Sequence, residues 1–144
     1  MTQFKKLSLK DTEVLLKFPA CISLLAANFE GHLDEVEKRS AIKFSHIKTF
    51  SCEPLLADFY KAADKVFKKN IEAIDRELPK QKDSRETAIK QELQIVAKVV
   101  SKLGKKYAAA INRGMESFKE HVSRAHNNVL VNFIFPIPIP GLTD

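Results

Sequence analysis

Apolar residues recur along the chain at steps of three and four, the spacing that places side chains on one face of an α-helix. The first such segment, Val14–Ala27, is apolar on nearly every side, which predicts a central core helix. Ser8 and Asp11 precede it and suit a helix start, through capping and early negative charge. Pro19 lacks an amide donor and crowds the preceding turn, so it should kink this helix or begin a new one.

The same spacing predicts two helices after this core segment. The first begins near Leu33, after a break around Gly31, and its early acidic residues suit the positive N-terminal end of a helix. The second begins at Ser51–Pro54, since proline is tolerated in the first turn. It should end at Leu78, because the residue before Pro79 is disfavoured in helical geometry.

The last apolar stripe covers residues 89–129 and keeps its phase across Gly104 and Gly114. It therefore predicts one helix, or two nearly collinear helices, ending near Asn127. Both glycines fall on or beside the apolar face, where a missing side chain would let another helix approach closely. The short polar turn Pro79–Asp83 before this stripe predicts an antiparallel pairing with the preceding helix.

These elements predict an all-α fold: a short helix pair packed on a long antiparallel αα-hairpin, with an extended Pro-rich C-terminal tail. The chain has 144 residues, enough to bury the core of one domain spanning residues 1–144. It contains only 4 glycines and 6 prolines, whereas a turn-rich all-β protein needs more of both.

The C-terminal segment 129–144 is both apolar and interrupted by prolines. Pro136, Pro138 and Pro140 alternate with apolar residues, which forbids a helix and favours extended geometry. Its large apolar side chains are Phe133, Phe135, Ile137 and Ile139. Because an exposed tail of this kind would promote aggregation, we expect it to occupy a groove of the same domain or of a second copy in a homo-oligomer. The alternative is a short tail that docks on a protein partner or inserts into a membrane.

The turn around Gly31 has a pattern suited to cation binding. With Gly31 at the sixth position of a calcium-type loop, four oxygen-bearing residues take positions 3, 5, 9 and 12: Asn28, Glu30, Asp34 and Glu37. The first position is Ala26 instead of an acid, which removes a primary ligand. The alternative is a glycine turn followed by acids that stabilise a helix N-terminus.

The segment Phe18–Glu37 resembles the opening motif of the tellurite-resistance TerB-like helical domains, in which an apolar helix ends in an acidic, glycine-containing turn. The resemblance implies an all-helical cytoplasmic domain that acts in stress-response and membrane-proximal assemblies without a known reaction. It further implies a divalent cation, such as Ca²⁺, Mn²⁺ or Mg²⁺, held by Glu30, Asp34 and Glu37 with Asn28 as a neutral donor. Glu30 stands where the family usually has Asp.

Positive charge gathers in the second half of the chain. The net charge is +6, and residues 79–144 hold 11 Lys/Arg against 6 Asp/Glu, whereas residues 1–78 hold 13 against 12. On a helical wheel, five cations share an arc of about 100°: Lys98, Lys102, Lys105, Lys106 and Arg113. Such a stripe is suited to a peripheral membrane contact or a protein partner, or is simply a solvated face. No recognition-helix motif or exposed aromatic accompanies it, which argues against nucleic acid.

Other chemistries find little support in the sequence. Cys21 and Cys52 are too far apart for a CxxC motif, and no phosphate-binding loop or nucleophile elbow occurs. No secretory signal is recognisable at the N-terminus, and the apolar stretch Val14–Ala27 is shorter than the roughly 20 residues needed to cross a bilayer. We therefore expect a cytoplasmic protein that is not an enzyme.

Overall fold

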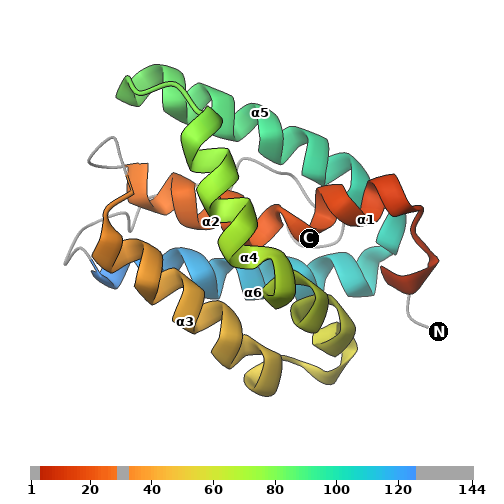
Figure 1. Cartoon of the computed structure of the whole chain (residues 1–144). Coiled ribbons are helices and arrows are strands. Elements are labelled where there is room, and N and C mark those ends of the chain that lie inside the picture. Colours follow the sequence, from red (N-terminus) through yellow and green to blue (C-terminus); the bar gives the residue numbers. More distant parts are fainter. Residues whose placement is uncertain (1–3, 29–32, 126–144) are drawn as a thin grey trace.

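The computed structural model describes residues 4–28 and 33–125, and every regular element in them is helical (Figure 1). The α-helices are α1 (Leu9–Leu16), α2 (Phe18–Ala27), α3 (Glu35–Ser51), α4 (Ala57–Glu77), α5 (Lys82–Val100) and α6 (Lys105–Ala125). Short 3-10 turns are η1 (Phe4–Lys6), η3 (Pro54–Leu56) and η4 (Ser101–Leu103). The predicted all-α class is confirmed.

Helix α2 is the centre of the core. All ten of its residues are buried, and Figure 1 shows it between α5 and α6, with α4 crossing it. Pro19 lies in its first turn, so the proline begins a new helix, and α1 is a separate helix capped by Ser8, which accepts a hydrogen bond from the Asp11 amide at 3.1 Å. Each large apolar side chain buried here contributes roughly 1.5–3 kcal/mol.

Helices α3 and α4 pack as an antiparallel pair, and two polar contacts show its register. Lys38 Nζ lies 2.9 Å from Glu72 Oε2, and His46 Nδ1 lies 3.1 Å from Asp64 Oδ2. Moving eight residues toward the C-terminus of α3, from Lys38 to His46, thus corresponds to moving eight residues toward the N-terminus of α4, from Glu72 to Asp64. As predicted, α4 ends immediately before Leu78, which is the residue preceding Pro79.

The last apolar stripe forms two separate helices, so the prediction of a single helix or two collinear ones is wrong. Gly104 has φ +85°, a left-handed conformation that favours glycine, and the chain changes direction there between η4 and α6 (Figure 1). Helices α5 and α6 both bury their apolar faces against α2. The apolar period therefore continues across the break although the helix axis does not.

The long αα-hairpin expected from α4 and the following helix is not confirmed. Helix α4 packs mainly on α3, α2 and α1. The Pro-rich tail 129–144, with Phe133, Phe135, Ile137 and Ile139, lies outside the described residues.

The two glycines of the last stripe have different roles. A Cβ on Gly114 would lie 2.0 Å from Tyr60 Oη, so the predicted close approach of another helix holds at this position. Gly104 has open space around it, and its function is the backbone turn. No helix of the described residues is long and apolar enough to cross a membrane.

Candidate functional site

The acidic turn places two of its candidate ligands in a reciprocal capping box at the start of α3. Asp34 is the N-cap, and its Oδ1 accepts a hydrogen bond from the Glu37 amide at 2.7 Å. Glu37 Oε1 in turn accepts from the Asp34 amide at 2.8 Å. These contacts satisfy two amides that a helix N-terminus otherwise leaves unpaired. Both residues therefore stabilise the start of α3, as the alternative to cation binding predicted.

The other two candidate ligands differ in how much the structure shows. Glu30 lies outside the described residues. Asn28 is 2% exposed, and its Nδ2 donates to the Lys82 carbonyl at 3.2 Å. Its Oδ1 accepts no hydrogen bond in the described part of the chain. No cluster of three or more His, Cys, Asp or Glu suited to a metal occurs among residues 4–28 and 33–125, so the four-ligand site stays a prediction.

The five cations predicted as one stripe belong to different elements. Lys98 is on α5, Lys102 on η4, and Lys105, Lys106 and Arg113 on α6, all of them exposed. Because the chain turns at Gly104, a single helical wheel does not apply to them. Lys102 Nζ lies 2.7 Å from Asp11 Oδ2, and Arg113 lies 3.0 Å from Glu53 Oε1. Their role toward a partner stays a prediction.

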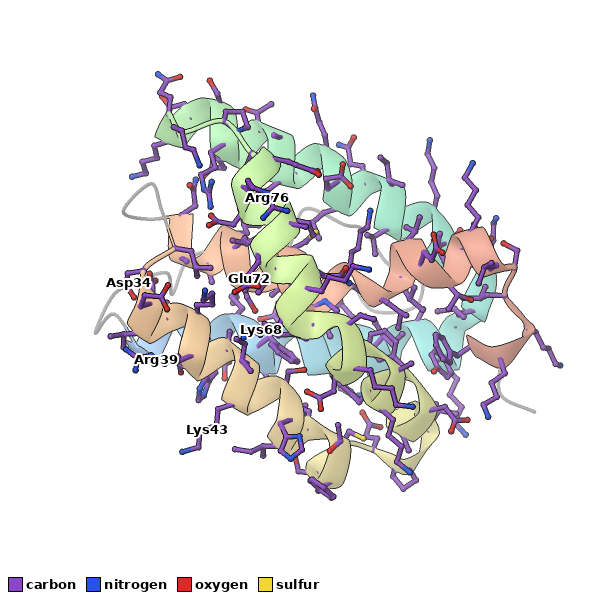
Figure 2. All side chains as sticks on the ribbon, viewed as in Figure 1. Asp34, Arg39, Lys43, Lys68, Glu72 and Arg76 are labelled. Carbon is purple, nitrogen blue, oxygen red and sulfur yellow. The ribbon has the colours of Figure 1, made fainter. Side chains whose placement is uncertain are left out.

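A second set of cations belongs to α3 and α4, and Figure 2 labels four of them, Arg39 and Lys43 on α3 and Lys68 and Arg76 on α4. We call it the cationic face, and its members are Arg39, Lys43, Lys61, Lys65, Lys68 and Arg76. All six are exposed, and none forms an ion pair within the described residues. The four α4 members fall within an arc of about 80° at 100° per residue.

Most carboxylates of α4 form ion pairs or hydrogen bonds with residues of other elements. Asp58 pairs with Lys5 at 3.9 Å, and Asp75 pairs with the buried Arg85. Asp64 accepts from Ser45 and contacts His46. The acids thus connect α4 to other elements while the cations point outward.

Acids also lie on this face: Glu72 and the Lys5-paired Asp58 fall within the arc of the α4 cations, and one lysine holds Glu72 together with Glu35 of α3. Lys38 Nζ lies 2.9 Å from Glu72 Oε2 and 3.3 Å from Glu35 Oε1. The hydrogen bonds that Lys38 donates, to Glu72 and then to Glu35, raise the pKa of Lys38, and the bond from Lys38 lowers the pKa of Glu72. Both groups are charged at neutral pH, so the lysine offsets these carboxylates.

Glu72→Gln should lower stability at neutral pH and have no effect in acid. Because the pKa of Glu72 is lower in the folded state, its stabilisation is present above the ordinary value of 4.5 and disappears as pH falls through the folded value. Urea unfolding midpoints measured from pH 7 to pH 3 should converge for the variant and the parent. Glu77→Gln is the control, at an exposed α4 position that forms no ion pair with the described part of the chain. A Glu72→Gln deficit that persists undiminished at pH 3 would contradict this assignment.

A cavity of about 190 Å³ opens between the end of α3, η3 and α6. Its lining includes Cys52, Glu53, Tyr60, Arg113 and Gly114. Burial raises the pKa of the Cys52 thiol, so the thiol is protonated at neutral pH. Glu53 and Arg113 engage each other across the opening. The cavity therefore presents no thiolate nucleophile.

Sequence reasoning missed the cationic face. The signal was present in α4, where Lys61, Lys65, Lys68 and Arg76 follow helical spacing, but the counts of positive and negative residues nearly cancel over residues 1–78. Comparison with protein-family models, with curated proteins and with solved structures finds no match.

Proposed function

We propose that this chain is a non-catalytic interaction domain that docks an anionic partner on the cationic face of α3 and α4. The observation that carries the proposal is the separation of charge across these helices: the cations point outward without ion pairs to the described residues, while the neighbouring acids are engaged. Several like charges on one surface produce a field that attracts anionic partners and speeds their association.

Retention on heparin, used as a polyanionic probe, tests the proposal. Lys61→Gln/Lys65→Gln/Lys68→Gln should elute at clearly lower salt than the parent chain, because it removes half of the cationic face. The substitution keeps helix propensity nearly unchanged, since Gln and Lys are similar helix formers.

The matched control removes the same charge elsewhere. Lys98→Gln/Lys105→Gln/Lys106→Gln changes three exposed lysines of the other basic set and should elute close to the parent. If this control loses retention and the α4 variant keeps it, the proposal is wrong and the partner surface lies on α5 and α6.

A second candidate function follows from the TerB-like resemblance: weak binding of Ca²⁺, Mn²⁺ or Mg²⁺ at the acidic turn, as part of a stress-response assembly. Its support is that the capping box holds the carboxylates of Asp34 and Glu37 together. The buried Asn28 Oδ1, two residues beyond Ala26, accepts no hydrogen bond within the described residues. An amide oxygen of this kind is a ligand that hard cations accept.

Asp34→Asn/Glu37→Gln separates cation binding from capping. Asn caps as well as Asp, and Gln can replace Glu in a capping box, so the helix start is retained while two charges are lost. A cation at 100 times its dissociation constant should stabilise the parent by about 2.7 kcal/mol and leave the variant unchanged. Thermal unfolding of chelator-treated protein with each cation measures this. An equal response of parent and variant, or no response of either, removes this second function.

A further inference from the structure

Helix α3 carries three large apolar side chains on its solvent side. Val36, Ile47 and Phe50 are 61%, 44% and 82% exposed. At 100° per residue they share an arc of about 80° with Arg39 and Lys43. The outer stripe of α3, defined by these five residues, thus carries the two cations between Val36 on one side and Ile47 and Phe50 on the other. Figure 2 shows the two cations projecting from α3 away from the core.

The α3–α4 register joins this outer stripe to the cationic face. His46 lies level with Asp64, so Phe50, four residues further along α3, is level with Tyr60, the residue before Lys61 on α4. The Phe50 ring also stands edge-on to His46, with centroids 5.5 Å apart. Phe50 is therefore placed where the apolar stripe meets the lysines of α4.

Charge and apolar exposure together select the class of partner. A polyanion or an acidic protein surface complements the cations, but it offers no apolar environment in which the exposed Val, Ile and Phe side chains could be buried. An anionic bilayer provides both, because its phosphates attract Lys and Arg while the boundary of its acyl chains accepts apolar side chains. Each Lys or Arg near such a surface raises partitioning roughly fivefold.

We infer that the anionic partner is a lipid bilayer surface, on which α3 and α4 lie flat with Phe50 and Ile47 inserted at the level of the headgroups. This inference depends on the proposed function, because the cationic face supplies the attraction. The acids nearest to the phosphates, Glu35 and Glu72, are offset by Lys38 and oppose the contact little.

Sedimentation of the full chain with phosphatidylcholine vesicles, with and without phosphatidylglycerol, tests the inference. The parent should bind only the anionic vesicles, and the binding should weaken with salt. Ile47→Ser/Phe50→Ser should reduce the partition coefficient about tenfold or more, the effect of withdrawing a large apolar side chain from the interface. Both positions are exposed, so the fold should tolerate the change, and thermal unfolding verifies this.

The control variant is Leu9→Ser, which removes a side chain that is 78% exposed on α1 and should leave vesicle binding unchanged. Heparin retention should be the same for Ile47→Ser/Phe50→Ser and the parent. Retention on heparin without vesicle binding, or vesicle binding that Ile47→Ser/Phe50→Ser does not reduce, overturns the bilayer inference and leaves the proposed function standing. Loss of both activities only in Lys98→Gln/Lys105→Gln/Lys106→Gln overturns both.

Discussion

Asp75→Ala should destabilise the fold by about 3 kcal/mol, because it leaves the Arg85 guanidinium buried without its counter-ion. Arg85 is 2% exposed, and its terminal nitrogens contact the Asp75 carboxylate and, at 3.4 Å, the Asp75 carbonyl. Removing one partner of a buried pair typically costs about 3–5 kcal/mol. The low end applies here because the Asp75 side chain is itself 33% exposed, so water can reach the vacated position. Urea unfolding measures the difference.

The companion variants separate charge from packing. Arg85→Met removes the charge, keeps most of the aliphatic volume and leaves Asp75 with access to water, so it should cost less than Asp75→Ala. In the Arg85→Met background, Asp75→Ala should add little further loss, since the stranded cation is gone. Glu86→Gln breaks the exposed pair with Lys90 and should change stability by less than about 0.5 kcal/mol. Equal costs for Asp75→Ala in both backgrounds would contradict the stranded-charge account.

The Arg85–Asp75 pair also shows what the sequence does not reveal. Arg85 follows a run of polar residues at the start of α5, and nothing in that run distinguishes a buried arginine from the exposed Lys80. Its burial arises because the end of α4 and the start of α5 meet around it. A polar residue in a polar segment has no periodicity that reports which neighbours will enclose it.

Local features were predicted well where local chemistry determines them. The apolar core segment, the interruption at Pro19 and the helix start at Ser8 each follow from a few adjacent residues. Of the two outcomes predicted at Pro19, a kink or a new helix, the structure has the new helix α2. The break at Gly104 was missed because apolar periodicity reports which side of a helix is buried. Since α5 and α6 bury their faces against the same α2, the period gave no warning of a change in axis.

The candidate surfaces were harder to predict, because counting charged residues does not show which side chains face solvent and which face other elements. Residues 1–78 are nearly balanced in charge, yet Asp58 and Asp75 of α4 face cations of other elements, while Lys61, Lys65 and Lys68 point outward. Only tertiary contacts decide which charges are compensated. The acidic turn differs, because its contacts lie within a single helical turn. The sequence predicted acids that stabilise a helix N-terminus there, and the structure adds that Asp34 and Glu37 form a capping box.

Gly114→Ala should destabilise the fold by about 2 kcal/mol, although alanine is the better helix former. The new Cβ would lie 2.0 Å from Tyr60 Oη and 3.2 Å from Tyr60 Cζ, so the tyrosine ring or α6 must move. The ring has little freedom, because it is 1% exposed and packs against Phe59 and Phe118. Overpacking costs about 1–3 kcal/mol, and a contact of 2.0 Å belongs at the upper end, so about 2 kcal/mol remains after the gain of up to about 1 kcal/mol from replacing glycine inside a helix. Chemical denaturation of the variant measures the net effect.

Tyr60→Phe should rescue Gly114→Ala, and this rescue distinguishes the clash from any other effect of the alanine. Tyr60 Oη makes no hydrogen bond within the described residues, so Tyr60→Phe alone should be neutral or slightly stabilising. With the hydroxyl gone, the nearest remaining ring atom lies 3.2 Å from the new Cβ, and a shift of a few tenths of an ångström suffices. In that background Gly114→Ala should cost little, because the propensity gain then offsets the residual contact. Gly104→Ala is the control: it forces alanine to a φ of +85° in open space, so it should destabilise the parent and the Tyr60→Phe variant equally. If Gly114→Ala costs the same in both backgrounds, the close approach of α4 and α6 at Tyr60 is not what requires glycine at this position.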